Sequence, residues 1–176
     1  MKDTAERFSH ITISLHWLIG LSIIGLLGVG IYMERTEAFA LYPIHKSVGV
    51  IIFVFILIRA VWRLINGWPV PAGNHQGWEI ALSKASHWVL LIGSILMPVT
   101  GMTMSGAGGH GIAVFGLTLL AKSEDKNEML AGLAHQAHWI IGYILVATVL
   151  LHIAGALKHH VLDGDGTLRR MLGARV

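Results

Sequence analysis

Four long apolar runs, nearly free of charged residues, constrain the fold of this chain more than any other feature of its sequence. Residues 8–33, 85–121 and 129–157 contain no Asp, Glu, Lys or Arg, and a shorter charge-free run, 47–58, lies within an apolar window from Ile44 to Ile65. Each can supply the roughly 20 residues that a helix needs to cross a bilayer. We therefore predict an all-α fold, an integral membrane four-helix up-down bundle. The bundle forms a single domain over residues 1–176, with helices at about 11–33, 44–65, 80–104 and 129–157.

The composition agrees with a membrane protein. Hydrophobic residues make up 54% of the chain and charged residues 13%, whereas soluble domains carry about 25% charged residues. The net charge is +3, but the basic residues lie at helix ends and in the C-terminal tail instead of forming one soluble basic face. We therefore expect the lipid bilayer, and no nucleic acid, as a partner.

The basic residues also predict how the bundle is oriented. Nine of the 13 Lys and Arg residues lie in the N-terminal segment, in the connection between the second and third helices and in the tail, and the others lie in the two remaining loops. Because cytoplasmic loops carry the excess of Lys and Arg, both termini are expected in the cytoplasm and the loops 34–43 and 105–128 outside. The apolar part of the 105–128 loop is too short to span, so we expect an interfacial or partly re-entrant segment there.

The absence of cysteine limits the chemistry that the chain can support. It excludes disulfides, iron–sulfur clusters and Cys-type zinc sites, so redox or metal chemistry must rest on histidine. Ionisable residues inside a membrane mark functional sites. The histidines at helix depth are His16, His45, His87, His135, His138 and His152.

The spacing of histidines in the fourth helix predicts two ligands on one stripe. His138 and His152 are 14 residues apart, which puts them roughly 21 Å apart along a helix and only about 40° apart in direction. His135 lies roughly 100° away from His152 by the same measure. His138 is therefore the better candidate of the two neighbouring histidines, and the pair would suit two redox centres stacked across the membrane.

The other helices can supply partners at matching depths. His16 lies near the inner end of the first helix and His45 near the outer end of the second. By depth, His45 pairs with His138 on the outer side, and His16 pairs with His152 on the inner side. His87, at the inner start of the third helix, is a spare histidine at the inner level.

Two b-type haems, each held by two imidazoles, explain these four histidines best. A flat macrocycle needs room beside its ligand, and a small residue follows each ligand four positions on: Gly20, Gly49, Gly142 and Ala156. A compact metal ion would instead draw its ligands to one level. The remaining alternative is that single histidines are satisfied by polar partners across helices. Arg59, deeper than its neighbour Arg63, is the candidate partner of a haem propionate.

Four segments of the sequence resemble, in order, the helices and tail of the bacterial cytochrome b561 family. They are "ISLHWLIG", "IHKSVGVIIFVFILIRAVWR", "SHWVLLIGSILMPVTGM" and "HIAGALKHHVLDGDGTLRRML". The resemblance implies a di-haem b cytochrome of the bacterial inner membrane that exchanges electrons with ubiquinone, and it implies superoxide oxidase activity. Its haem ligands, carried over by motif, fall on His16, His45, His138 and His152. Some members have one histidine at the start of the fourth helix, whereas "HQAH" offers two.

The expected function is electron transfer from superoxide outside to ubiquinone inside. Lysines of the outer side can attract an anion: Lys46, Lys122 and Lys126. Residues of the inner side are candidates for proton transfer or quinone binding: His87, His159, Arg59 and Arg63. One alternative is a haem-b anchor that relays electrons between a dehydrogenase or hydrogenase and quinone. Another is a non-redox transporter or sensor with a histidine proton relay, which would be colourless.

Overall fold

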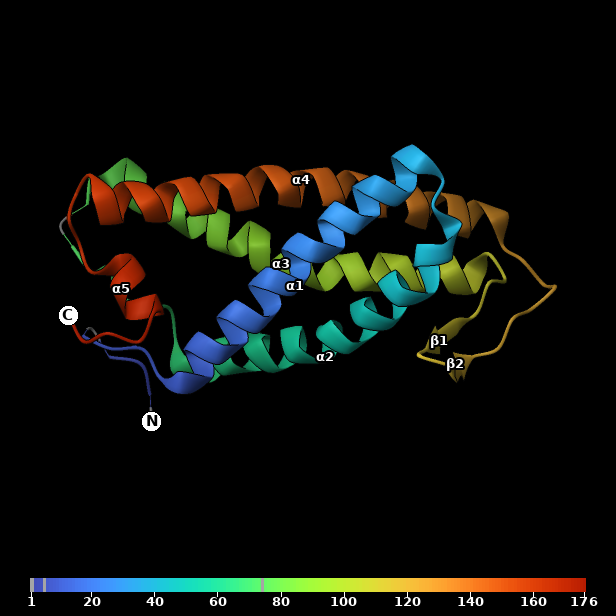
Figure 1. Ribbon diagram of the computed structural model, residues 1–176, viewed down its shortest axis with the longest axis horizontal. Coiled ribbons are helices and arrows are strands. Elements are labelled where there is room, and N and C mark those ends of the chain that lie inside the picture. Colours follow the sequence, from blue (N-terminus) through green and yellow to red (C-terminus); the bar gives the residue numbers. More distant parts are fainter. Residues whose placement is uncertain (1, 5, 74) are drawn as a thin grey trace.

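The computed structural model describes residues 2–4, 6–73 and 75–176, and its four long helices pack into one bundle (Figure 1). The helices are α1 (His10–Thr36), α2 (Tyr42–Asn66), α3 (Gly77–Ala107) and α4 (Glu128–Val161). Among the described residues, these four helices are long and apolar enough to cross a bilayer. The predicted all-α membrane bundle is confirmed, and each helix contains its predicted span and extends past it at both ends.

Polar caps let three of the four helices begin before their predicted spans. The Ser9 hydroxyl accepts a hydrogen bond from the Thr12 amide at the start of α1. Asn127 accepts one from a backbone amide in the first turn of α4, and Gln76 and Glu79 form a capping box at the start of α3. Such caps satisfy amide groups that the first turn of a helix leaves without partners. The helices therefore continue past the length that hydrocarbon alone would require.

The bundle is built from two closely packed helix pairs, α1 with α2 and α3 with α4. Between α1 and α2 the core consists of four buried aliphatic residues, Leu15, Ile19, Ile52 and Ile56. Between α3 and α4 a Cβ atom at Gly93 would lie 2.7 Å from the Leu145 side chain, so the helices approach closely there. Many large apolar side chains elsewhere on the helices are exposed, which fits a surface that contacts lipid.

The two ends of the bundle differ (Figure 1). The terminal end holds both chain termini, the α2–α3 connection and the short helix α5 (Thr167–Met171). The opposite end, here called the hairpin end, holds a 3-10 turn, η1 (Phe39–Leu41), and the strands β1 (Ile112–Val114) and β2 (Leu117–Leu120). The α3–α4 connection thus lies at the opposite end from the termini.

The interfacial or re-entrant segment expected in the α3–α4 connection takes the form of a β-hairpin. Val114 pairs with Leu117 across a two-residue turn in which Phe115 and Gly116 both have positive φ, at 45° and 94°. Two-residue turns of this hand match the twist of paired strands. The Ser47 hydroxyl of α2 accepts a hydrogen bond of 3.0 Å from the Phe115 amide, which holds the hairpin against the bundle.

An ion-pair network at the terminal end holds the N-terminal segment against α1 and α2. The Asp3 carboxylate accepts hydrogen bonds from the Ser9 amide and the Thr12 hydroxyl, both at 2.8 Å, and lies 3.4 Å from the Arg63 guanidinium. Arg63 also donates to the Gly67 carbonyl at 2.8 Å. The sequence makes Arg63 a candidate for proton transfer or quinone binding. The structure gives this side chain partners in the N-terminal segment and at the end of its own helix.

Asp3→Asn should lower the thermal midpoint by a few degrees at neutral pH, because a charged hydrogen-bond acceptor is lost at a cost of ~1–3 kcal/mol. Burial raises the pKa of Asp3, but hydrogen bonds from Ser9 and Thr12, with the charge of Arg63, outweigh it and hold that pKa below its usual value. A lowered pKa stabilises the folded state above the pKa of the unfolded chain, and this contribution is lost as pH falls through the folded-state pKa.

The difference in midpoint between the wild type and Asp3→Asn should therefore be constant from about pH 5 to 8 and shrink below about pH 4. Thermal unfolding followed by tryptophan fluorescence in detergent measures it. A difference that stays the same in acid would show that the charge of Asp3 does not stabilise the fold.

Candidate functional site

The predicted ligands face each other in two pairs, one toward each end of the bundle. Toward the hairpin end, His45 of α2 and His138 of α4 have ring centroids 6.4 Å apart. Toward the terminal end, His16 of α1 and His152 of α4 have ring centroids 6.1 Å apart. A metal ion held by two imidazoles lies about 2 Å from each ligating nitrogen, so both separations suit an iron between the rings.

Contacts with α3 fix the orientation of the His138 ring. Its Nδ1 lies 2.9 Å from the Met97 carbonyl of α3, which can only accept, so Nδ1 carries the proton and Nε2 keeps its lone pair. Metal-ligating histidines commonly donate their other ring N–H to a carbonyl in this way. The Thr100 hydroxyl lies 3.1 Å from the same nitrogen. His135, one turn earlier, is exposed, so the structure directs His138 toward His45 and leaves His135 outside the pair.

A small apolar cavity lies beside His45 and His138. Gly49, Ile52, Ser94 and Leu145 are among the residues that line it with the two histidines. At about 60 Å³ it is smaller than a haem, so its apolar side chains would have to move apart to admit one.

Two features fit haem at this level. The His45 Nδ1 is buried with no hydrogen-bond partner among the described residues, so this imidazole has a buried nitrogen that no protein group uses. Gly49, four residues after His45, has no heavy atom within 4 Å of the place where a Cβ would stand. The chemistry of the residues and the open face beside Gly49 therefore fit a bis-imidazole haem.

A third histidine joins the pair toward the terminal end. The His87 ring of α3 lies 5.4 Å from the His152 ring and stacks on Trp68, with centroids 6.1 Å apart and an angle of 24° between the planes. Trp88 packs against Trp68 at 5.0 Å. The structure thus places His87 at the level of His16 and His152, as predicted by depth, and within reach of His152.

Arg59 lies at this level too. Both of its terminal nitrogens are 3.4 Å from the His16 Nδ1. A guanidinium only donates hydrogen bonds, so the His16 Nδ1 is the acceptor in this contact. If His16 binds iron through Nε2, Nδ1 must carry the proton, and Arg59 must then turn to another acceptor. This requirement fits the predicted contact between Arg59 and a haem propionate.

The remaining candidates lie apart from the two histidine pairs. The Lys46 ammonium donates to the Ser105 hydroxyl at 3.1 Å, beneath the hairpin. The His159 ring lies against His75, with centroids 4.2 Å apart, and its Nδ1 is 2.7 Å from the Asp163 carboxylate. No contact of His159 with His87 or His152 occurs among the described residues.

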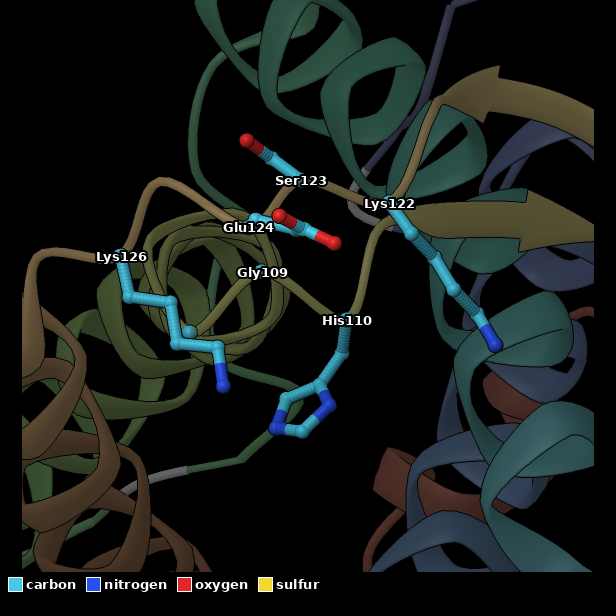
Figure 2. A pocket seen from close by; sticks show the side chains of 7 residues that line it. Gly109, His110, Lys122, Ser123, Glu124 and Lys126 are labelled. Carbon is cyan, nitrogen blue, oxygen red and sulfur yellow. The ribbon is translucent and has the colours of Figure 1, made fainter.

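Lys122 and Lys126 line a pocket of about 490 Å³ at the hairpin end. Figure 2 shows the two ammonium groups and the His110 imidazole around this pocket, with the Glu124 carboxylate between Ser123 and His110. The two lysines therefore give the pocket a net positive charge, and Glu124 offsets part of it.

Several residues that shape the site are not predicted from the sequence. Met97 and Thr100 orient His138, Gly101 lies against it, and His110 lines the hairpin-end pocket. No local signal marks these residues, because their roles depend on how α3 packs against α4 and on how the connection folds back.

Gly101→Val should remove haem from the hairpin-end site. A Cβ at this position would lie 3.2 Å from the His138 Cε1 and 3.4 Å from its Nδ1, and the two further methyl groups of valine would push the ring off its hydrogen bond with Met97. Haem content per chain, measured by absorption of the purified protein, should fall by about half. Gly132→Val is the matched control, because its Cβ position has no heavy atom within 4 Å. Equal haem loss in both variants would show that helix propensity, not crowding of His138, is responsible.

Comparisons with known proteins find a family model and relatives that match nearly the whole chain. A family model described as prokaryotic cytochrome b561 matches residues 7–174. "Cytochrome b561 homolog 2" of Escherichia coli (strain K12) is 28% identical over 97% of this chain and 94% of its own length. "Probable superoxide oxidase CybB" of Yersinia pestis is 26% identical over 95% and 96%. "Cytochrome b561 homolog 1" of Escherichia coli (strain K12) is 25% identical over 97% and 99%.

Proposed function

The chain belongs to the prokaryotic cytochrome b561 family, and we propose that it binds two haem b groups and transfers electrons from superoxide to ubiquinone. As a member of this family it is a membrane electron-transfer protein that binds haem b. The number of haems, the donor and the acceptor are the proposal. So is the orientation, in which the hairpin end faces the periplasm and the terminal end the cytoplasm.

The observation that carries the proposal is the pair of facing histidines at each of two levels. His45 and His138 would hold one iron toward the hairpin end, and His16 and His152 another toward the terminal end. When bound, each haem accepts and releases one electron at a time. With two imidazoles as ligands, each iron would have no position free for oxygen, which would favour electron transfer over oxygen binding.

The outer pocket supports superoxide as the electron donor. Superoxide is an anion, and Lys122 and Lys126 line an open pocket at the end of the bundle where His45 and His138 lie. Positive side chains at a pocket raise the local concentration of an anionic substrate. Each superoxide loses one electron and leaves as dioxygen. The name of the Yersinia pestis relative agrees with this donor.

The terminal end would receive the electrons and deliver them to quinone. Reduction of ubiquinone to ubiquinol takes two electrons and two protons, so two superoxide ions are consumed for each quinol. His87 is the nearest unassigned imidazole to His152, and it stacks on Trp68, whose side chain is 45% exposed. We propose that His87 binds the quinone or passes it a proton. Arg59 would hold a propionate of the same haem.

The charge pair Lys122→Glu with Lys126→Glu should slow reduction of the protein by superoxide by roughly tenfold at low salt, because charge steering changes association rates by this order. The effect should fade near 1 M salt, where the Debye length is about 3 Å. Lys84→Glu, an exposed change at the terminal end, is the control and should leave the rate unchanged. Equal slowing in the control, or slowing that salt does not relieve, would remove the role of the lysines.

The proposed function is tested by rapid mixing of the oxidised protein with superoxide, in detergent and with a short-chain ubiquinone. The haem absorption bands should shift to the reduced form within the mixing experiment and return as quinol forms. Haem reduction that is too slow to compete with the spontaneous dismutation of superoxide would rule out superoxide as the donor. Reduction by superoxide without quinol formation would rule out ubiquinone as the acceptor. Co-purification with dehydrogenase subunits would instead favour the anchor alternative.

A further inference from the structure

A second cluster of metal-binding side chains lies at the terminal end, outside both histidine pairs. His75, His159 and Asp163 each offer one ligand atom, and these atoms lie within 4.8 Å of one another. The three residues come from separate segments: the α2–α3 connection, the last turn of α4 and the turn that follows α4. The electron path proposed above, through the two histidine pairs to His87, uses none of the three.

The geometry of the cluster is compact and partly buried. The His159 Nδ1 lies 2.7 Å from an Asp163 oxygen, and the His75 and His159 rings are 4.2 Å apart. The His75 side chain is 9% exposed and that of His159 16% exposed, whereas Asp163 is 33% exposed. The two imidazoles are thus held in place, and the carboxylate has the freedom to adjust.

Asp165 supports the cluster from outside. Its carboxylate lies 3.5 Å from the His75 Nε2 and 3.9 Å from the His159 Nδ1. It accepts hydrogen bonds from the Thr167 amide at 2.8 Å and hydroxyl at 3.0 Å. Gly73 packs against it so closely that a Cβ there would lie 3.3 Å away. A fixed carboxylate beside a histidine is the usual second partner of a metal-ligating imidazole.

The charges around the cluster favour a cation. Besides Asp163 itself, the carboxylates of Asp165 and Glu79 lie nearby, and so do two cations, Lys158 and Arg170. The Lys158 ammonium pairs with both Asp163 and Glu79, so it keeps a partner if Asp163 turns to a metal ion. Arg170 interacts with Asp165.

We propose that His75, His159 and Asp163 bind one divalent transition-metal ion of the zinc class. Two imidazoles and a carboxylate are a donor set that zinc accepts, with water in the fourth position. Ligand atoms around a tetrahedral zinc lie roughly 3–4 Å apart, since each bond is about 2 Å long. The present spacing requires only a small movement, which the exposed Asp163 side chain can make. The ion would tie the α2–α3 connection and the turn after α4 to the end of α4.

Zinc titration of the haem-loaded protein, purified without a histidine tag, tests the proposal. A chromophoric chelator that competes for zinc reports the affinity. We expect one tight zinc per chain and at least tenfold weaker binding in His75→Gln and in Asp163→Asn. Asp165→Asn should weaken binding by about 10-fold to 100-fold, as changes beside metal ligands do. His10→Ala, at an exposed histidine, should not change it. Magnesium should not compete, because it prefers oxygen ligands.

X-ray absorption at the zinc edge provides a readout that does not depend on the variants. A shell that contains two imidazoles with oxygen ligands supports the proposal. Absence of tight zinc binding, or tight binding that His75→Gln and Asp163→Asn leave unchanged while their haem spectra remain native, would overturn it. These results are independent of superoxide and quinone, so failure here leaves the proposed electron-transfer function standing.

Discussion

His138→Ala should leave the protein with one haem, whereas His135→Ala should keep both. His138 faces His45 across the bundle and is oriented by the Met97 carbonyl, so its removal would take away one of the two proposed ligands of the hairpin-end haem. His135 is exposed on the same helix. Haem content per chain should fall by about half in the first variant only, and reduction by superoxide should largely stop, because the remaining haem lies at the far end.

The absorption spectrum of the reduced proteins measures this difference, and His135→Ala is the matched control. Both variants change one histidine of "HQAH" to the same residue, so helix propensity and net charge change equally. Two haems in His138→Ala, or one haem in His135→Ala, would show that the wrong histidine was assigned to the iron.

His152→Ala should have the complementary effect at the terminal end. It removes the imidazole that lies between His16 and His87, so the terminal-end haem should be lost. Superoxide should still reduce the remaining haem at close to the wild-type rate, but quinol should no longer form. A stopped-flow trace that shows fast haem reduction without reoxidation by quinone is the expected signature.

His16→Ala and His87→Ala distinguish the two possible partners of His152. We expect His16→Ala to lose the terminal-end haem and His87→Ala to keep it while quinol formation slows. The opposite pattern would mean that His87 is the ligand. The His87 ring lies 5.4 Å from the His152 ring, whereas the His16 ring lies 6.1 Å from it. In that case His16 and Arg59 would form a polar pair beside the haem.

The sequence predicts the helices well because a bilayer imposes a simple rule on it. Every backbone polar group in hydrocarbon must be satisfied within the chain, so an apolar run of sufficient length becomes a helix. The runs around Leu15, Ile52 and Leu145 therefore needed no tertiary information. The predicted helices are too short at both ends. Their starts depend on single polar capping residues such as Ser9 and Asn127, which an apolar pattern does not weigh.

The hairpin escaped prediction for a local reason. Its strands are only three and four residues long, too short for an alternating pattern to stand out. Its turn also contains Phe115 at positive φ, whereas the turn residues that signal a hairpin are Asn, Asp and Gly. The hydrogen bond from the Phe115 amide to Ser47, 68 residues away, joins segments whose proximity appears only in the fold.

The site residues likewise divide into those that helical periodicity predicts and those whose contacts lie far apart in the sequence. Helical period alone distinguishes His138 from His135, and the structure places the two side chains accordingly. The partners of Arg63 and His75 could not be read in the same way. Asp3 lies 60 residues from Arg63, and Asp165 lies far along the chain from His75, so these contacts exist only because both termini and the α2–α3 connection meet at one end (Figure 1).

The ratio of haem to chain shows whether each of the two histidine pairs holds an iron. Pyridine haemochrome absorption gives the haem and amino-acid analysis gives the chain, on protein purified from membranes with haem in excess. We predict two b-type haems per chain, with the sharp α-band of a low-spin, six-coordinate iron in the reduced state. One haem per chain at saturation, or a high-spin spectrum, would contradict it.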